Sequence, residues 1–289
     1  MPKSLEIICT IDELRTKIAS WRKDKLSIGF VPTMGALHGG HLSLVARSVA
    51  DNDRTCVTIF VNPRQFGPGE DFRAYPRDYQ ADTQALEDCK ADLLFAPSVE
   101  EMYPTGSVTS VSVIGIGDIL EGEFRPDFFK GVATVITKLL FQVLPDRVYF
   151  GEKDYQQLCL IERMKSDLDI PVEIIGCPTI RERDGLALSS RNIYLNKEQR
   201  SVAPGLHRIL IETAEHFHKS NNSNQAIFKG KMALIKSGFT KVDYIAICDP
   251  ATLNQAEQNT GSVRVLGAAW LGRTRLIDNV EFKGINALS

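Results

Sequence analysis

Two histidines stand three positions apart in a glycine-rich segment of the chain. The segment reads Val31-Pro32-Thr33-Met34-Gly35-Ala36-Leu37-His38-Gly39-Gly40-His41. Glycine lets a backbone come close to a ligand, and the first turn of a helix offers N–H groups and a partial positive charge. If a helix begins here, the segment predicts a site for an anion, most simply a phosphate.

The elements on either side fit this interpretation. An apolar run over 26–31 is typical of a buried strand, and apolar residues recur after His41 at helical spacing. The segment is neither a GxxxxGK[ST] loop, because His41 follows Gly40, nor a GxGxxG fingerprint. The HxxH pattern alone is also compatible with a capped surface turn, or with a metal pair that lacks its other ligands.

Three more polar clusters follow predicted strands or turns. Asn62 and Gln65 come after an apolar run over 56–61, and Lys153, Asp154 and Gln157 come after a run over 147–150. Ser189-Ser190-Arg191 follows a charged turn over 181–185. Ligands of open parallel sheets bind at the carboxyl ends of strands. Together the clusters supply positive charge and hydrogen-bond donors but little acid or base, which favours phosphoryl or nucleotidyl transfer.

The remaining pattern predicts the fold class. Thr10-Ile11-Asp12-Glu13 indicates a capping box that opens a helix, and further helices are expected over 79–90 and 132–143, with strands over 92–96, 108–114 and 172–175. We predict a Rossmann-like, doubly wound α/β domain with a parallel sheet over residues 1–179. Helices over 197–218 and 224–236 and strands over 242–248, 263–269 and 274–278 predict a smaller α+β domain over 180–289.

Composition excludes several classes of partner. The chain has 289 residues, with 34 Lys and Arg against 36 Asp and Glu. The chain has no run of like charge, which argues against nucleic acid or an anionic membrane surface as its main partner. Residues 1–6 lack the apolar core of a signal peptide, and no apolar stretch reaches the length of a membrane span. The six cysteines are scattered and are expected to act as small hydrophobes. We expect a soluble, cytoplasmic protein.

Seven segments carry a resemblance to a known family. They are PTMGALHGGH (32–41), FVNPRQF (60–66), YPRD (75–78), LFAPS (94–98), YFGEKDYQQL (149–158), DGLALSSRN (184–192) and AAWLGRTRLIDN (268–279). With them the chain closely resembles the pantothenate synthetase (pantoate–β-alanine ligase) family of the HxGH-type nucleotidyltransferase superfamily. The resemblance implies a reaction in which ATP and pantoate give pantoyl-adenylate and pyrophosphate, after which β-alanine displaces AMP to give pantothenate. It also implies a homodimer.

The resemblance implies roles for individual residues. His41, His38, Lys153 and Arg191 would be catalytic. ATP would be bound by Met34, Gly35, Ala36, Leu37, His38, Gly39, Gly40, His41, Gly151, Glu152, Lys153, Asp154, Ile180, Leu188, Ser189, Ser190 and Arg191. Pantoate or β-alanine would contact Pro32, Thr33, Asn62, Gln65 and Gln157. Mg2+ would lie between the phosphates. Asp82 matches one acidic position of the family's metal site, but its neighbours Ala81 and Ala85 cannot ligate a metal.

The expected chemistry agrees with these residue types. The pantoate carboxylate is already ionised at neutral pH, so its attack on ATP needs no general base. Neutral amides such as Gln65 and Gln157 hold the carboxylate without the ground-state stabilisation that an arginine would cause. In the second step the β-alanine ammonium must lose a proton, either to His41 or to water. The smaller domain is expected to close over ATP and exclude water.

One segment departs from the family pattern, and three other functions compete. Relatives read RPGHF where this chain has Arg125-Pro126-Asp127-Phe128-Phe129, so the sequence does not decide the shape of the pantoate pocket. Another adenylyltransferase, acting on nicotinate mononucleotide or phosphopantetheine, would share the HxGH-type loop but not FVNPRQF, GEKDYQQL or the second domain. A catalytically inactive ATP-binding regulator would not need the full set of His38, His41, Lys153 and Arg191. A synthetase-like RNA binder would need a basic face.

Overall fold

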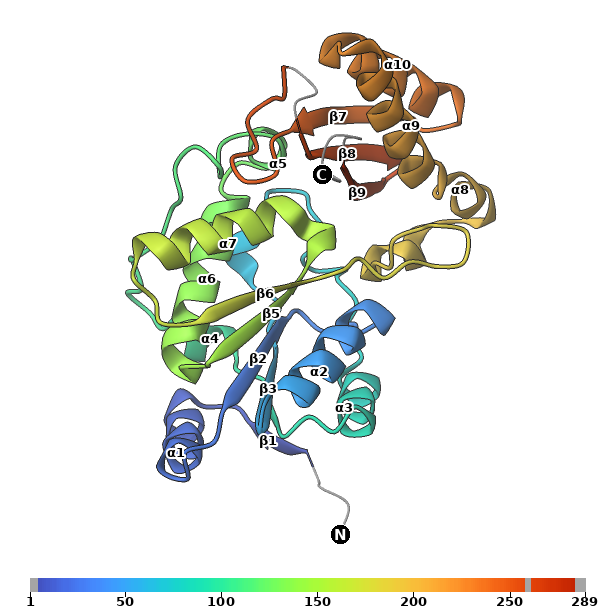
Figure 1. The fold of residues 1–289 in the computed structure, drawn as a ribbon. Coiled ribbons are helices and arrows are strands. Elements are labelled where there is room, and N and C mark those ends of the chain that lie inside the picture. Colours follow the sequence, from blue (N-terminus) through green and yellow to red (C-terminus); the bar gives the residue numbers. More distant parts are fainter. Residues whose placement is uncertain (1–4, 258–260, 284–289) are drawn as a thin grey trace. The chain divides into compact units, whose positions relative to one another are not determined.

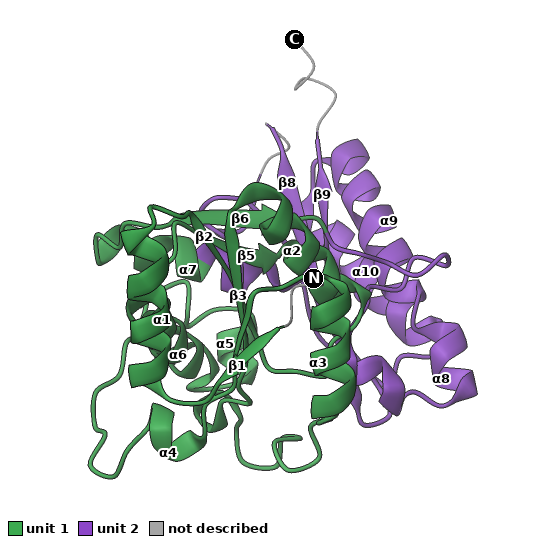
Figure 2. Ribbon diagram, turned by 90° about the horizontal axis from the view of Figure 1, so that it is seen from below, with its two compact units in different colours: residues 1–152, 160–178 green, residues 153–159, 179–289 purple. Residues whose placement is uncertain are grey.

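The computed structural model describes residues 5–257 and 261–283, which fall into two compact units (Figure 2). Unit 1 comprises Met1–Glu152 and Leu160–Pro178, and unit 2 comprises Lys153–Cys159 and Thr179–Ser289. Residues 153–159 thus group with unit 2, whereas the sequence prediction places them in the first domain. Residues 1–4, part of the amino-terminal segment interpreted above, lie outside the described residues.

Unit 1 contains a six-stranded parallel sheet of order β1-β4-β3-β2-β5-β6 (Figure 1). The strands are β1 Glu6–Ile8, β2 Ile28–Thr33, β3 Arg54–Ile59, β4 Leu93–Phe95, β5 Arg147–Gly151 and β6 Glu173–Cys177. The predicted Rossmann-like sheet is confirmed. The strand order reverses between β2 and β5, which is where open α/β sheets bind ligands.

Helices cover both faces of this sheet. α2 (Gly39–Asp51) and α3 (Tyr79–Asp88) lie on one face, and α1 (Ile11–Lys23) and α6 (Phe128–Val143) on the other (Figure 1). Val31, Val57, Val45 and Leu86 are fully buried between the sheet, α2 and α3. The remaining helical elements are η1 Pro63–Gln65, α4 Val99–Met102, α5 Glu121–Phe124, η2 Glu152–Asp154 and α7 Tyr155–Asp167, whose residues 160–167 belong to unit 1.

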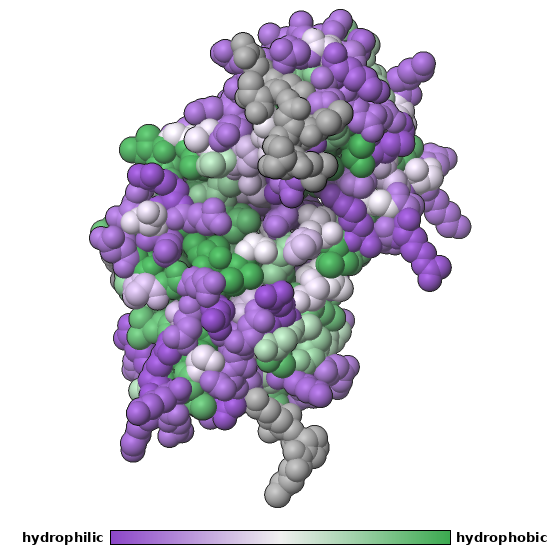
Figure 3. Space-filling model, in the orientation of Figure 1, coloured by the Kyte–Doolittle hydropathy of each residue, from purple (hydrophilic) through white to green (hydrophobic). Residues whose placement is uncertain are grey.

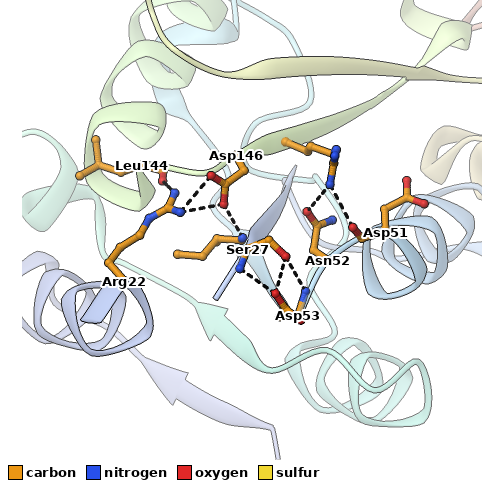
Figure 4. Close-up of polar contacts among 9 residues, drawn as sticks. Arg22, Ser27, Asp51, Asn52, Asp53, Leu144 and Asp146 are labelled. Atoms are coloured by element: carbon orange, nitrogen blue, oxygen red, sulfur yellow. Dashed lines mark hydrogen bonds and ion pairs between the residues drawn. The ribbon is translucent and has the colours of Figure 1, made fainter. Parts of the chain in front are cut away.

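A polar network fixes the amino-terminal ends of the central strands (Figure 4). The Asp146 carboxylate, just before β5, accepts from the N–H of Ile28 at 2.7 Å and from Arg22 Nη1 at 2.8 Å. Asp53, just before β3, accepts from the Ser27 N–H at 2.9 Å and from the Ser27 hydroxyl at 2.7 Å. These bonds align the strands from one edge of the sheet. The loops at the opposite ends of these strands carry most of the predicted site residues that belong to unit 1.

Unit 2 is an antiparallel sheet covered by two helices. The strands β7 Lys241–Cys248, β8 Val263–Leu271 and β9 Thr274–Phe282 pair in the order β7-β8-β9. α9 (Gly205–Ser220) and α10 (Ser223–Lys236) pack on the sheet, with α8 (Lys197–Val202) and η3 (Ser190–Tyr194) before them. Leu206, Leu210, Phe217 and Val265 form its core. Hydrophilic side chains predominate on the part of unit 2 that Figure 3 displays.

The structure differs from the sequence prediction in several elements. Residues 108–114 form no strand, and Val108 and Ile114 are 91% and 89% exposed, so their alternating pattern does not mark a buried face. The helix predicted over 197–218 is two helices, because Pro204 has no N–H to continue α8. β1 was not predicted; it is a three-residue edge strand paired with β4. No helix among the described residues is long and apolar enough to cross a membrane.

Candidate active site

The two histidines form the amino-terminal cap of α2. His38 has an extended backbone, and its Nδ1 accepts a hydrogen bond from the Gly40 N–H at 3.1 Å. His41 Nδ1 accepts in turn from the His38 N–H at 3.4 Å, which is long for such a bond. The two rings stack with centroids 4.1 Å apart. Because Nδ1 is the acceptor in both rings, a neutral imidazole at either position carries its proton on Nε2 and donates from there.

The turn between β2 and α2 is held from two sides. Gly35 and Ala36 both lie in the left-handed region, with φ of 82° and 50°. The Gly35 N–H donates to Thr33 Oγ1 at 3.2 Å, and that hydroxyl donates to the Thr58 carbonyl at 2.6 Å. On the other side the carboxylate of Asp82 accepts from the backbone of the turn. Burial raises the pKa of Asp82 above its usual value, and its two backbone hydrogen bonds oppose the shift.

Asp82 does not fit the role of magnesium ligand that the sequence suggested. Both of its oxygens accept backbone hydrogen bonds, and the residue is 4% exposed. Among the described residues, no group of three His, Cys, Asp or Glu side chains is placed to hold a metal.

Asn62 and Gln65, in the loop after β3, have different roles. Asn62 is 1% exposed, and its amide donates to the Gln65 Oε1 and the Gly131 carbonyl, both at 3.1 Å. Its oxygen accepts from the Tyr103 hydroxyl at 3.0 Å and from the Arg64 N–H at 3.2 Å. These four bonds use the whole hydrogen-bonding capacity of an asparagine side chain. Asn62 can therefore act on a ligand only through Gln65.

Gln65 links the loop after β3 to the loop after β2. Its Nε2 lies 2.8 Å from the sulfur of Met34, so the loops at the ends of two neighbouring strands touch within unit 1. Gly131 on α6 permits the approach, since a Cβ there would lie 2.1 Å from the Arg64 carbonyl oxygen. One acceptor position on Gln65 Oε1 and one proton on Nε2 lie outside its bonds to Asn62 and Met34.

The departure from the family pattern lies directly behind this loop. Asp127, where relatives have glycine, precedes α6 with φ of 66°, a conformation that favours glycine. The Phe128 ring stacks on the Arg125 guanidinium at 3.7 Å. Arg125 in turn binds Glu70 at 2.7 and 2.8 Å and the Gln65 carbonyl at 3.4 Å. Phe128 therefore supports the segment that carries Gln65.

Unit 2 contains the predicted lysine and its supports. Lys153 lies in η2, its side chain is 19% exposed, and its ammonium is 3.8 Å from Asp154. Its carbonyl accepts from Asn279 Nδ2 on β9 at 2.9 Å. The Asn279 Oδ1 accepts from Arg264 at 3.0 Å, and the Arg264 guanidinium lies 3.8 Å above the Tyr155 ring. Gln157 follows on α7 and is half-buried.

A short hairpin in unit 2 carries the remaining predicted residues. The Leu188 N–H donates to the Ile180 carbonyl at 3.0 Å, and Gly185 at the tip has φ of 95°. Arg181 makes a two-pronged bond to the buried Asp278 at 2.6 and 2.9 Å, which ties the hairpin to β9. The charged turn predicted over 181–185 is confirmed.

The serine–arginine segment that follows the hairpin is also capped. Ser189 is the amino-terminal cap of η3, and its hydroxyl accepts from the Arg191 N–H at 3.3 Å. The side-chain amide of Asn192 donates to the Ala187 carbonyl at 3.0 Å. These contacts hold Ser190 and Arg191 directly after the hairpin in a short helical turn.

The predicted residues thus form two groups. Unit 1 holds Pro32, Thr33, the segment 34–41, Asn62, Gln65, Asp82, Gly151 and Glu152, and unit 2 holds Lys153, Asp154, Gln157, Ile180, Leu188, Ser189, Ser190 and Arg191. Sequence reasoning assigned no role to Asp278 and Asn279, although their segment was among those that resembled the family. Their role depends on partners about 100 positions earlier in the chain.

Comparison with known proteins identifies the family of the chain. Residues 6–281 match the family model described as pantoate-beta-alanine ligase. A pantothenate synthetase of Paramagnetospirillum magneticum is 51% identical, over 97% of this chain and 99% of the relative. Another, of Rhodospirillum rubrum, is 48% identical over 96% and 99%.

Solved structures of such proteins have the same fold. The crystal structure of pantothenate synthetase from Thermus thermophilus matches with a TM-score of 0.90 and 46% identity, over 96% of this chain and 99% of that one. A pantoate-beta-alanine ligase from Francisella tularensis, complexed with beta-gamma ATP and beta-alanine, matches with a TM-score of 0.82 and 38% identity, over 96% and 97%.

Proposed function

Because the chain belongs to the pantoate–β-alanine ligase family, we propose that it joins pantoate to β-alanine at the expense of ATP. In the first step a pantoate carboxylate oxygen attacks the α-phosphorus of ATP. The bond between that phosphorus and the oxygen bridging the α- and β-phosphates breaks, and pyrophosphate leaves. In the second step the amine of β-alanine attacks the carbonyl carbon of pantoyl-adenylate, and AMP leaves. The products are pantothenate, AMP and pyrophosphate, and the amine proton goes to His41 or to water.

The cap of α2 supports the first step. Negative charge develops on the α-phosphate oxygens and on the departing pyrophosphate, and preorganised donors lower the energy of that state. The Nε2–H groups of His38 and His41 are such donors, because Nδ1 of each ring is committed to the backbone. We assign His41 as the catalytic histidine. The helix terminus behind it adds backbone N–H groups and a partial positive charge.

The loop after β3 supports binding of pantoate. Gln65 offers one donor and one acceptor from a neutral amide, and Asn62 fixes its orientation from a buried position. A neutral amide orients the carboxylate while leaving its nucleophilicity intact. Gln157 in unit 2 has the same chemistry and is assigned to the same substrate, and Pro32 and Thr33 at the end of β2 complete this part of the proposal.

The cationic residues of unit 2 are assigned to the phosphates of the same ATP. Lys153, Ser189, Ser190 and Arg191 supply charge and donors, and Ile180 on the hairpin is assigned to the adenine side. Magnesium would enter with ATP and neutralise phosphate charge. Closure of unit 2 over the nucleotide, a homodimer and a cytoplasmic location stay predictions.

The observation that carries the proposal is the contact of Gln65 with Met34, which joins the histidine loop and the amide loop at neighbouring strand ends. The direct test is product analysis with ATP, magnesium, pantoate and β-alanine. We expect pantothenate, AMP and pyrophosphate in equal amounts, and no pantothenate when any one substrate is omitted. Formation of ADP and phosphate would overturn the adenylate route, and absence of pantothenate would overturn the function.

A further inference from the structure

The buried carboxylate of Asp82 grips the turn that precedes the two histidines. Its Oδ2 accepts from the Ala36 N–H at 2.9 Å, and its Oδ1 accepts from the Leu37 N–H at 2.7 Å. Asp82 lies on α3, one turn in from the start of that helix, and 46 positions beyond Ala36. Both oxygens are thus used on consecutive N–H groups immediately before His38.

The turn has a conformation that needs such a grip. Ala36 has φ of 50°, and this left-handed region is disfavoured for a residue that has a Cβ. Gly35, with φ of 82°, lies so close that a Cβ would be 3.0 Å from Asp82 Oδ2 and 3.0 Å from Ile59 Cγ2. A charged acceptor with two N–H donors is among the stronger hydrogen-bonding arrangements in proteins. It offsets the conformational cost at Ala36.

Two features argue against Asp82 as a metal ligand in this chain. A magnesium ion on either oxygen would have to share that oxygen with a backbone N–H, in a residue that is 4% exposed. Its neighbours on α3, Ala81 and Ala85, have no ligating atoms in their side chains. Of these three residues, only Asp82 could therefore give a side-chain oxygen to a magnesium ion, and its two oxygens already accept backbone hydrogen bonds.

We propose that Asp82 is a positioning residue for the His38–His41 cap and not a ligand of magnesium. The Asp82 carboxylate holds Ala36 and Leu37 so that the chain enters α2 with His38 at its cap. It also takes two N–H groups of the turn out of competition for phosphate, which leaves phosphate recognition to the histidines and to the start of α2. The consequence for ATP rests on the proposed function, whereas the consequence for the turn does not.

Amide hydrogen exchange tests the grip without any substrate. In the wild-type protein the Ala36 and Leu37 amides should be protected, and magnesium chloride alone should leave their exchange rates unchanged. A metal bound to the Asp82 oxygens would draw negative charge away from both hydrogen bonds, weaken them and accelerate exchange of both amides. Acceleration by magnesium, or unprotected amides in the wild-type protein, would overturn the proposal, and neither result depends on a variant that folds.

Two substitutions on α3 sharpen the test. Asp82→Asn keeps one acceptor oxygen, so at least one of the two amides should exchange roughly 10–100-fold faster, as for loss of a hydrogen bond to a charged group. Asp88→Asn removes the same charge from an exposed position of the same helix and should leave both amides unchanged. Equal protection of both amides in Asp82→Asn and the wild type would contradict the grip.

The magnesium dependence of pyrophosphate–ATP exchange separates positioning from metal binding. We expect Asp82→Asn to lower the maximal exchange rate while the half-saturating magnesium concentration stays within about twofold of wild type. Loss of a metal ligand would instead raise that concentration by roughly 10–100-fold, and added magnesium would restore the rate. That result would overturn the proposal. A wild-type protein without any exchange would refute the proposed function, and the amide measurements would still decide the role of Asp82.

Discussion

At the scale of single residues, His41 is held by a bond that sets which nitrogen carries its proton. Nδ1 accepts from the His38 backbone, and Nε2–H remains as the donor. We predict that His41→Ala lowers kcat by roughly 10²–10³, the cost of losing one transition-state donor, with a modest change in ATP affinity. Steady-state kinetics with isothermal titration of ATP would measure both. Near-normal turnover in the variant would remove His41 from the mechanism.

The contacts of Gln65 and Asn62 predict an effect on the KM for pantoate. Gln65→Ala should raise the KM for pantoate at least about tenfold and leave the KM for ATP nearly unchanged, because the amide orients only the hydroxy acid. Asn62→Ala should produce a weaker form of the same defect, since Asn62 acts through Gln65. A defect confined to ATP in the Gln65 variant would show that the loop after β3 has been assigned to the wrong substrate.

The residues of the site were predictable to different degrees. His38 and His41 could be found because a glycine turn before a helix is a local pattern. The different roles of Asn62 and Gln65 could not be predicted, because they depend on Tyr103 and Gly131. These residues lie 41 and 69 positions beyond Asn62 in the chain. The hydrogen bonds of Asp82 could not be predicted for the same reason, since its partners in the turn are 45 and 46 positions away.

At the scale of elements, strand β9 connects two segments of the proposed ATP site. Successive residues of a strand point to opposite faces. Accordingly, Asp278 binds Arg181 of the hairpin, and the neighbouring Asn279 binds the carbonyl of Lys153. The strand itself was predicted from its composition. Its function was not, since the two bonds span 97 and 126 positions.

Asn279→Asp tests this connection with little change in volume. Aspartate keeps an acceptor for Arg264 but replaces the donor that serves the Lys153 carbonyl, so the lysine loop should shift while the strand stays folded. We predict a loss of up to roughly 10²-fold in kcat/KM for ATP, the cost of a misplaced catalytic group, with the KM for pantoate preserved. Glu281→Gln, at an exposed position of β9, is the matched control. Equal kinetics in both variants would contradict the role of Asn279.

The hardest elements to predict were those whose formation depends on a single residue or on an adjacent strand. Pro204 divides a helix that the apolar periodicity carries straight through. The segment 108–114 has strand-like residues but no adjacent strand, so Val111 bonds instead to Thr134 of α6. Long periodic helices and apolar strands, by contrast, were found because burial on one face leaves a repeating pattern.

At the scale of the whole molecule, His207 gives stability a dependence on pH near neutrality. Burial, together with the positive charge of Arg181, lowers the pKa of His207 below its usual 6.5, and the negative charge of Asp278 only partly opposes this. The unfolded chain therefore binds a proton in a range of pH where the folded chain does not. The stability that His207 contributes is fully present above pH 6.5 and is lost as the pH falls from 6.5 toward the pKa of His207 in the folded protein.

Thermal unfolding between pH 8 and 5 would measure this effect. We predict that the midpoint falls as the pH drops below about 6.5 and that His207→Gln removes that part of the decline, because glutamine does not titrate. Carboxylates whose pKa is lowered from 3.8, such as Asp53 and Asp184, contribute stability that is lost only at more acidic pH. An identical pH profile in the variant would exclude His207 as the source.

The central claim concerns the first chemical step of the whole enzyme. Its most direct test is the exchange of labelled pyrophosphate into ATP, with magnesium and pantoate present and β-alanine absent. Exchange that requires pantoate, and that ends with release of AMP once β-alanine is added, is the result we predict. Exchange without pantoate, or no exchange by a protein that still binds both ATP and pantoate, would contradict a pantoyl-adenylate intermediate.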